Sequence, residues 1–328
     1  MPFWPPRESV PSAEIRIPFR NMHAVEIRGA KPGELAEVHA MLERAFTGLP
    51  RSFFDRRASR SPGFRPGHTR VLLLDGRIVS CARVYFRTVY IAGEPVLCGG
   101  LGDVGTDPEF RGMGFSTRCI ENALQCMEQK GAPLSMLFTH IQPFYSRLGY
   151  FPVRTSDLAV NIPKSGGDIR CRNVDLKKDL PALKKLYDSA VRGRTGPLHR
   201  TGAYWKKQAD FPNLDPAFFW IGEKKGRAVC YARGNPAKDR LHIREFAFAP
   251  GMEQALFSLL SVMARLTNGN VLFLPFVSER EERLFGPWMH SIQENTRWMV
   301  KLIDLKRREM LRELFNPGQA LFWDSDRF

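Results

Sequence analysis

The chain has 328 residues, of which 43% are hydrophobic and 25% charged, a composition typical of a globular protein with room for two domains. It contains no apolar run long enough to cross a membrane and no secretion signal at its start, so we expect a cytoplasmic protein without a membrane partner. The formal net charge of +15 favours an anionic ligand. Because the arginines are dispersed and form no recognisable nucleic-acid motif, we do not expect nucleic acid as the main partner.

Cysteine and histidine spacing argues against a metal site. Six cysteines are scattered along the chain without a close pair, and seven histidines show no spacing that suits a ligand set. We therefore expect buried thiols in a reducing compartment and no bound metal.

The first half predicts alternating helices and strands in a definite order. A helix is expected over 33–46, an irregular basic region over 51–69, and strands over 70–74, 78–90 and 95–106. The turn sequences Asp75-Gly76 and Ala92-Gly93-Glu94 make these strands consecutive hairpins. The remaining elements predicted in this half are a helix over 116–130, a strand over 134–139, a short helix over 143–148 and a strand near 151–161.

The second half repeats this order after a linker-like segment at 163–168. Where the first half has a glycine turn, the repeat has Gly251-Met252-Glu253-Gln254, without a basic residue or a second glycine. We therefore expect the second half not to hold the same phosphorylated ligand. The elements predicted here are a helix around 180–191, strands over 218–222, 227–233 and 241–249, a helix around 256–263 and a strand over 270–276.

The glycine turn of the first half is the most informative motif. Arg111-Gly112-Met113-Gly114-Phe115-Ser116 follows a strand and opens a helix, so its backbone N–H groups and the helix N-terminus can approach a phosphate closely. About thirty residues on, after a helix and a strand, the chain reads Phe144-Tyr145-Ser146-Arg147-Leu148-Gly149-Tyr150.

Together these two motifs resemble the GNAT superfamily of acyl-CoA-dependent N-acetyltransferases. Arg111, Gly114 and Ser116 match the family turn, with Ser116 in place of the usual Gly or Ala, and Phe144-Tyr145 with Gly149-Tyr150 matches its aromatic ending. Two tandem units, of which only the first has an intact turn, are similar to the Eis-like (enhanced intracellular survival) branch, here without that branch's sterol-carrier-like domain. The resemblance implies an α/β (α+β) fold of two GNAT-like domains, each a mixed, mostly antiparallel sheet flanked by helices.

The resemblance also implies a domain plan. It consists of an N-terminal arm over 1–21, an acetyl-CoA-binding domain over 22–163, a degenerate second domain over 164–305 and a C-terminal tail over 306–328.

Site residues follow from the same resemblance. Acetyl-CoA would be the co-substrate, its diphosphate held by backbone N–H groups of the turn and its pantetheine arm paired with the preceding strand. Tyr145 would be the general acid that protonates the leaving thiolate, and the terminal carboxylate of Phe328 the base, with Glu109 and Glu245 as substitutes. We expect Glu245 to be an ordinary exposed glutamate. The expected cofactor-binding residues are Val104, Gly105, Thr106, Arg111, Gly112, Met113, Gly114, Phe115, Ser116, Thr117 and His140.

The predicted function is transfer of an acetyl group to a primary amine of a small molecule or a lysine, by direct attack on the thioester. A CoA-binding regulatory module without turnover and a basic nucleic-acid-binding protein are the alternatives. The sequence leaves the acceptor, the role of the second unit and homo-oligomer formation open.

Overall fold

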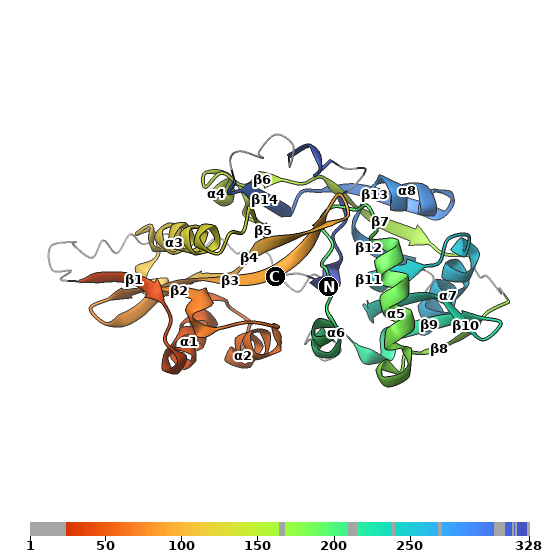
Figure 1. The fold of residues 1–328 in the computed structure, drawn as a ribbon, viewed down its shortest axis with the longest axis horizontal. Helices are drawn as coiled ribbons and strands as arrows, with labels where there is room; N and C mark the ends of the chain where they lie inside the picture. Colours follow the sequence, from red (N-terminus) through yellow and green to blue (C-terminus); the bar gives the residue numbers. More distant parts are fainter. Residues whose placement is uncertain are drawn as a thin grey trace.

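The computed structural model describes residues 24–163, 168–208, 215–237, 240–267, 271–304, 312–316, 318 and 320–326. Within these residues the chain forms two seven-stranded sheets of mixed strand direction, each flanked by helices (Figure 1). This confirms the expected fold class of two tandem α/β units. The N-terminal arm, Phe328 and most of the predicted linker lie outside the described residues.

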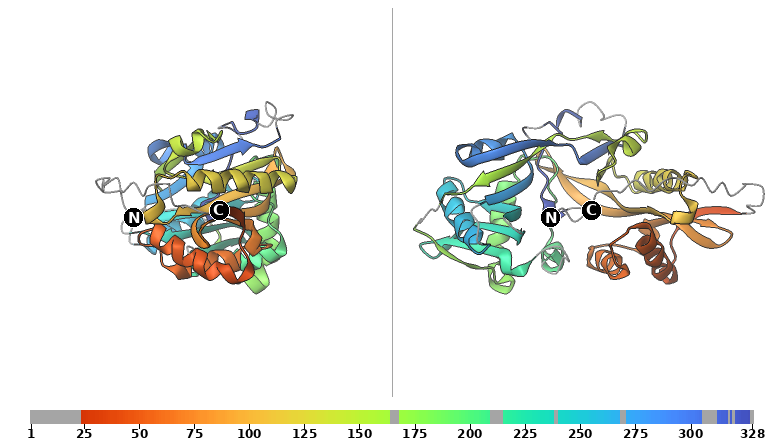
Figure 2. Two further views of the ribbon diagram at one scale, coloured as in Figure 1. Left: turned by 90° about the vertical axis from the view of Figure 1, so that its left-hand side faces the viewer. Right: turned by 180° about the vertical axis from the view of Figure 1, so that it is seen from behind.

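The first sheet has the strand order β1-β2-β3-β4-β5-β14-β6. Helix α3 lies on one face, while α1 and α2 lie on the other (Figures 1 and 2). The elements of this unit are β1 (Val25–Gly29), α1 (Leu35–Ala45), α2 (Arg51–Arg60), β2 (Thr69–Leu74), β3 (Arg77–Ile91), β4 (Glu94–Thr106), α3 (Phe115–Gln129), β5 (Leu134–Phe138), α4 (Gln142–Ser146), β6 (Phe151–Pro152) and β14 (Trp298–Leu302).

The region predicted to be irregular over 51–69 instead contains helix α2. Phe54 and Ala58, four residues apart, are buried on one side of this helix, where Phe54 joins a core cluster with Val38 and Leu42 of α1. The segment was predicted to be irregular because it is rich in Arg, Ser, Gly and Pro. Burial of this side of α2 stabilises the helix despite that composition, because tertiary packing supplies most helix stability in proteins.

The second sheet has the order β13-β7-β12-β11-β10-β9-β8, and its helix α7 packs on β9, β10 and β11. None of the described helices is long and apolar enough to cross a lipid bilayer. The elements of this unit are β7 (Thr155–Asn161), β8 (Arg170–Asn173), α5 (Leu176–Ala190), α6 (Gly202–Gln208), β9 (Phe219–Lys224), β10 (Arg227–Pro236), β11 (Leu241–Phe248), α7 (Glu253–Arg265), β12 (Val271–Val277), α8 (Glu279–Phe285) and β13 (Met289–Asn295).

The two units exchange strands. Strand β7 leaves the first unit and pairs with β12 and β13, whereas β14 leaves the second unit and pairs with β5 and β6. A single cut at residue 163 therefore does not separate the sheets, because each sheet takes one strand from the other half of the chain.

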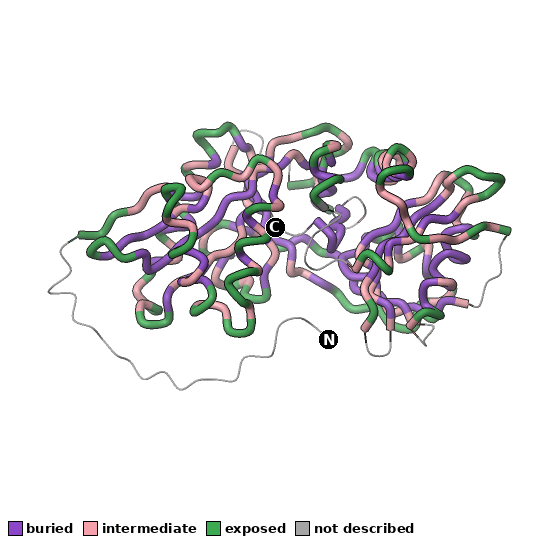
Figure 3. Tube along the Cα trace, turned by 90° about the horizontal axis from the view of Figure 1, so that it is seen from below, coloured by how far each residue is buried: buried purple, intermediate pink, exposed green. Residues whose placement is uncertain are grey.

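The last described residues, 320–326, are buried between the units, and buried backbone runs through both sheets (Figure 3). The backbone N–H of Leu321 donates to the carbonyl of Thr195 at 2.9 Å. Phe322 stacks on Trp298 of β14 with 4.7 Å between ring centroids, while Trp323 packs on Phe246 of β11 at 5.1 Å. The tail thus contacts the core of both units.

Candidate functional site

Strands β4 and β5 pair over only three residues of each strand. The parallel ladder joins Cys98, Gly99 and Gly100 of β4 to β5, and β4 then continues to Thr106. In the part of the chain that the structure describes, no strand pairs with β4 beyond Gly100 on the side of β5. Val104, Gly105 and Thr106 lie in this unpaired stretch, so their main-chain groups on that side remain available to an extended ligand.

A bulge distorts β4 within the same stretch. The register with β3 shifts between Cys81 and Arg83, which pair with Gly105 and Gly102 respectively, so β4 carries one extra residue. Asp103 lies at this bulge with a φ of 46°. A Cβ on Gly105 would approach Leu42 Cδ2 of α1 to 2.8 Å, so a larger residue there would force the Leu42 side chain to shift.

The glycine turn lies between β4 and α3 and is exposed. Gly112 and Gly114 have φ values of 82° and 74°, and a Cβ on either would meet no atom within 4 Å. Glycine is therefore needed for the backbone conformation, while the space beside the turn stays open. Arg111 Nη2 donates to the carbonyl of Ala45 at 2.8 Å, which ties the turn to the end of α1.

The amide groups of this turn point to an anion site. No hydrogen bond joins the backbone N–H groups of residues 112–117 to another described residue. They stand at the N-terminus of α3, a 15-residue helix whose dipole places partial positive charge at this end. Met113, Phe115, Ser116 and Thr117 thus belong to a cradle of N–H donors, with the Phe115 side chain buried as its anchor.

Tyr145 comes from α4, which follows β5. Its side chain is buried, and burial raises its pKa to about 12. The phenol donates no hydrogen bond to a described residue, and its ring packs edge-on against Phe144 and Tyr150 at 4.9 and 5.9 Å between centroids. A phenol with this pKa keeps its proton at neutral pH and remains able to donate it.

Neighbouring residues hold β5 in place. Tyr150 OH lies 2.7 Å from Ser135 Oγ, which in turn donates to the carbonyl of Gly99 at 2.8 Å. This bridge fastens β5 to β4 just before the two strands diverge. His140 is exposed after the end of β5, with its ring edge-on to Phe138 at 5.4 Å.

A buried polar cluster around Asp103 was not predicted. Its carboxylate accepts from Arg83 Nη1 at 2.7 Å and from Tyr85 OH at 2.6 Å, and Arg57 Nε lies 3.2 Å away. Burial alone would raise the pKa of Asp103, but the guanidinium groups of Arg57 and Arg83 hold it below its usual value. The available sequence signal was the occurrence of charged residues, Arg83 and Asp103, in the middle of long strand-like segments.

The cluster extends through His39 of α1. Arg83 Nη2 lies 2.7 Å from His39 Nε2, and His39 Nδ1 lies 2.5 Å from Asp55 Oδ1 on α2. Burial and the charge of Arg83 lower the pKa of His39, so its neutral ring accepts from the arginine and donates to Asp55. The cluster therefore links α1, α2, β3 and β4.

A second buried cluster holds the tail. Arg200 donates to both carboxylate oxygens of Glu245 at 2.9 and 2.8 Å, and its Nη2 lies 2.9 Å from Asp326 Oδ2. Tyr204 OH donates to Asp326 Oδ1 at 3.0 Å. The carbonyl of Asp326 accepts from Arg87 of β3 at 3.4 Å, which places this part of the tail beside the first sheet.

The expectation that Glu245 is exposed was wrong. Its side chain is fully buried, and although burial would raise its pKa, Arg200 lowers it to about 2. Glu245 is therefore an ion-pair partner of Arg200. Glu109 is exposed and lies 3.0 Å from Arg77.

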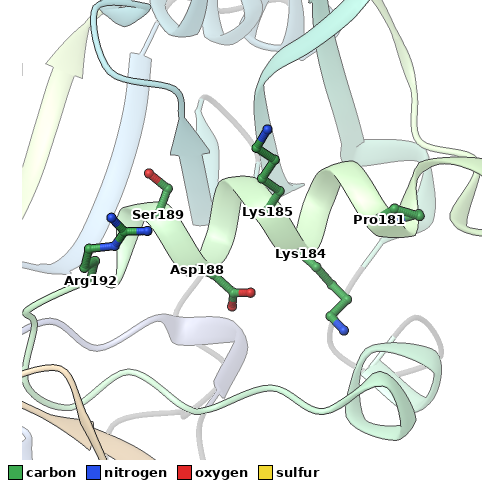
Figure 4. A pocket seen from close by; sticks show the side chains of 6 residues that line it. All are labelled: Pro181, Lys184, Lys185, Asp188, Ser189 and Arg192. Atoms are coloured by element: carbon green, nitrogen blue, oxygen red, sulfur yellow. The ribbon is translucent and has the colours of Figure 1, made fainter.

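A hollow along α5 is separate from these groups. It is lined by Pro181, Lys184, Lys185, Asp188, Ser189 and Arg192. Figure 4 shows Lys184 and Asp188 leaving one side of the helix and Lys185 and Ser189 another. The lining lies wholly in the second unit and shares no residue with the opening beside β4. Among the described residues, no three His, Cys, Asp or Glu side chains are grouped to hold a metal ion.

Comparison with known proteins agrees with the geometry. Residues 26–153 match the family model described as an acetyltransferase (GNAT) domain. An uncharacterized N-acetyltransferase of Streptomyces avermitilis is 22% identical over 261 residues, which cover 72% of this chain and 60% of that protein. One from Streptomyces coelicolor is 26% identical over 208 residues, which cover 60% of this chain and 49% of that protein. The chain thus spans about half to three fifths of these relatives.

Solved structures share the tandem fold. A GCN5-related N-acetyltransferase from Kribbella flavida has a TM-score of 0.69 at 17% identity, covering 86% of this chain and 71% of that one. Eis1 from Mycobacterium abscessus has a TM-score of 0.64 at 15% identity, and the match covers 88% of this chain and 76% of that one. N-myristoyltransferase from Saccharomyces cerevisiae, solved with bound myristoyl-CoA, has a TM-score of 0.57 at 10% identity, covering 86% and 79%.

The buried cluster yields a stability prediction. Asp103→Asn should lower the free energy of unfolding at pH 7 by about 3–5 kcal/mol, because two guanidinium groups lose their carboxylate. The folded pKa of Asp103 lies below its unfolded value, so its stabilising contribution is present above about pH 3.9 and is lost as the pH falls through the folded pKa. The difference between wild type and variant, measured by urea unfolding, should therefore shrink in acid.

Asp75→Asn is the matched control. Asp75 is an exposed turn residue, and its replacement should change stability by less than about 0.5 kcal/mol. An equal loss in the two variants would contradict the role assigned to the Asp103 cluster.

Proposed function

We propose that this chain, whose residues 26–153 match the family model of an acetyltransferase (GNAT) domain, transfers an acetyl group from acetyl-CoA to a primary amine. The amine would belong to a small molecule or a lysine. The observation that carries the proposal is the open row of N–H donors at the start of α3, next to the unpaired end of β4. A phosphate-bearing, extended ligand fits both features at once.

The residues present suit CoA. The N–H groups of residues 112–117 would bind the diphosphate, and the open sides of Gly112 and Gly114 leave room for close approach. Main-chain groups of Val104 and Thr106 would pair with the pantetheine arm, with Gly105 between them and His140 across the opening. When bound, acetyl-CoA supplies the activated thioester carbonyl.

Proton transfers then fall to side chains of this domain and to the chain end. Tyr145 would donate its proton to the departing sulfur, because its buried phenol is neutral at physiological pH. The amine must lose a proton to attack, and we assign this step to the terminal carboxylate of Phe328. The clamping of Asp326 beside Arg87 supports this assignment, since only two residues separate that clamp from the chain end.

The second unit would hold no cofactor. Its corresponding helix, α7, begins with Glu253, and a carboxylate there repels phosphate. All six cysteines are free, which agrees with a cytoplasmic location.

The principal test follows free thiol while the full chain is incubated with acetyl-CoA and a panel of amines. Thiol release should depend on the amine, and Tyr145→Phe should lower kcat by about 10²–10⁴-fold while the Kd for CoA stays within about twofold. Tyr150→Phe is the control: it removes the hydrogen bond to Ser135 and costs about 1 kcal/mol of stability. Because Ser135 keeps its hydrogen bond to Gly99 and so still fastens β5 to β4, kcat should stay nearly unchanged. Thiol release without any amine dependence, or no release and no CoA binding, would reject the proposal.

Two glycines at opposite ends of α3 test the phosphate cradle. Gly114 and Gly131 have φ values of 74° and 72°, and a Cβ on either meets no atom within 4 Å. Replacement by alanine should therefore lower the free energy of unfolding of the two variants by a similar amount, about 1–2 kcal/mol. Gly114→Ala, but not Gly131→Ala, should raise the Kd for CoA by about tenfold or more, as measured by calorimetry. The reason is that alanine strains the αL conformation that orients the N–H groups of the turn. Equal Kd values for the two variants would contradict the assignment of the turn to the cofactor site.

Truncation tests the base. Deleting Phe328 moves the terminal carboxylate by one residue, about 3.3–3.6 Å of extended chain, so kcat should fall at least about tenfold. The Kd for CoA should hardly change. Phe328→Leu keeps the carboxylate in register and should retain most of kcat. Undiminished turnover after the deletion would assign the proton transfer to another group.

A further inference from the structure

The face of the first sheet opposite α3 carries a row of polar side chains. Along β3, Val84 and Phe86 pack toward α3, whereas Arg83, Tyr85 and Arg87 alternate with them and point to the other face. Tyr85 pairs with Gly100, the last residue of β4 that is joined to β5. This row therefore lies one strand away from the place where the opening begins.

Helices from both units flank the row. From α2, the Arg57 guanidinium lies 5.5 Å from the centroid of the Tyr85 ring. From α6, Tyr204 OH accepts from Arg87 at 3.2 Å, and the Arg87 guanidinium lies between the rings of Tyr85 and Tyr204 at 5.6 and 5.3 Å. In Figures 1 and 2, α2 and α6 lie side by side below β3.

The two helices meet at one point. Lys207 Nζ of α6 donates to the carbonyl of Ser59 on α2 at 3.3 Å. Arg56 is exposed one helical turn before Ser59, so it shares the side of α2 that meets α6. We call the exposed cations Arg56, Lys206 and Lys207 the basic rim.

Positive charge dominates this region. Helix α2 carries four arginines and one aspartate, and α6 carries two lysines and no acidic residue. That aspartate, Asp55, lies against His39 at 2.5 Å and within 4.0 Å of Arg51. In the buried row below, Arg57 and Arg83 pair with the carboxylate of Asp103, and Arg87 lies beside Asp326 of the tail. The field at this face therefore attracts anions and repels polycations.

Accordingly, we propose that the acceptor is an amine whose own molecule carries carboxylates, either a free acidic amino acid or an acidic peptide. This rests on the proposed acetyl transfer, because the acceptor must approach the thioester from the face that the cofactor turn of α3 leaves free. Carboxylates of the acceptor bind the basic rim while its amine approaches the opening beside β4. Polyamines and polycationic amines are disfavoured by the same charges.

The experiment compares acceptors that differ only in charge. Thiol release by the full chain is measured with acetyl-CoA and lysine-centred peptides flanked by glutamate, serine or arginine, and with free glutamate and spermidine. The glutamate-flanked peptide should have a kcat/KM at least about tenfold above the arginine-flanked one, with the difference residing in KM and shrinking as salt rises. Comparing kcat/KM for free glutamate with that for the glutamate-flanked peptide distinguishes a free amino acid from a peptide as the source of the carboxylates.

Charge reversal locates the effect. The double variant Arg56→Glu and Lys207→Glu should lower the acidic-to-basic preference by about tenfold or more, through a higher KM for the glutamate-flanked peptide. The double variant Lys224→Glu and Arg227→Glu makes the same change of net charge on exposed residues of the β9–β10 hairpin, in the second unit. It should keep the wild-type preference.

The outcomes separate the two proposals. The inference is overturned if spermidine or the arginine-flanked peptide is the preferred acceptor, or if both double variants have an equal effect. Either result leaves the proposed acetyl transfer intact. No thiol release from any amine overturns acetyl transfer, and the inference with it. The inference is also overturned if the protein shows no preference among the amines but binds single-stranded nucleic acid, and the rim variant abolishes that binding.

Discussion

The loss of pairing between β4 and β5 after Gly100 is the constraint on which the site depends. A continuous ladder would satisfy the main chain of β4 internally and leave nothing for a ligand. Here the bridge from Tyr150 through Ser135 to Gly99 holds the strands together up to the divergence, and the bulge at Asp103 turns β4 away beyond it. The opening is thus built into the sheet and needs no movement to form.

Maintaining that opening requires buried charge. Desolvation makes isolated buried carboxylates costly, so Asp103 is kept ionised only because Arg57, Arg83 and Tyr85 surround it. The same contacts fix the bulge from α2 and β3. An apolar residue in place of Asp103 would avoid the desolvation cost, but it could not bind Arg57 of α2 and Arg83 of β3. The charge is therefore explained by the need to hold these two elements against the bulge.

The sequence predicted the parts of the fold that local patterns encode. The strands around Asp75-Gly76, the glycine turn and helix α3 follow from turn chemistry and periodicity, and they form as expected. Helix α2 was missed because its stability comes from Phe54 packing on α1, which is a tertiary effect. The exchange of β7 and β14, and the ion pairs of Asp103 and Glu245, join residues between 20 and 168 positions apart, and no local pattern records such contacts.

The exchange of strands and the tail together suggest why a second unit without a phosphate turn is retained. Removing it would take β14 from the first sheet and the partners of Asp326 from the tail. Buried ion pairs such as Arg200 with Glu245 and Asp326 add little net stability, since desolvation offsets their attraction, but they strongly disfavour any other placement of the same charges. We infer that the second unit acts as a frame: it supplies β14 and α6 to the first unit and holds the tail at Asp326.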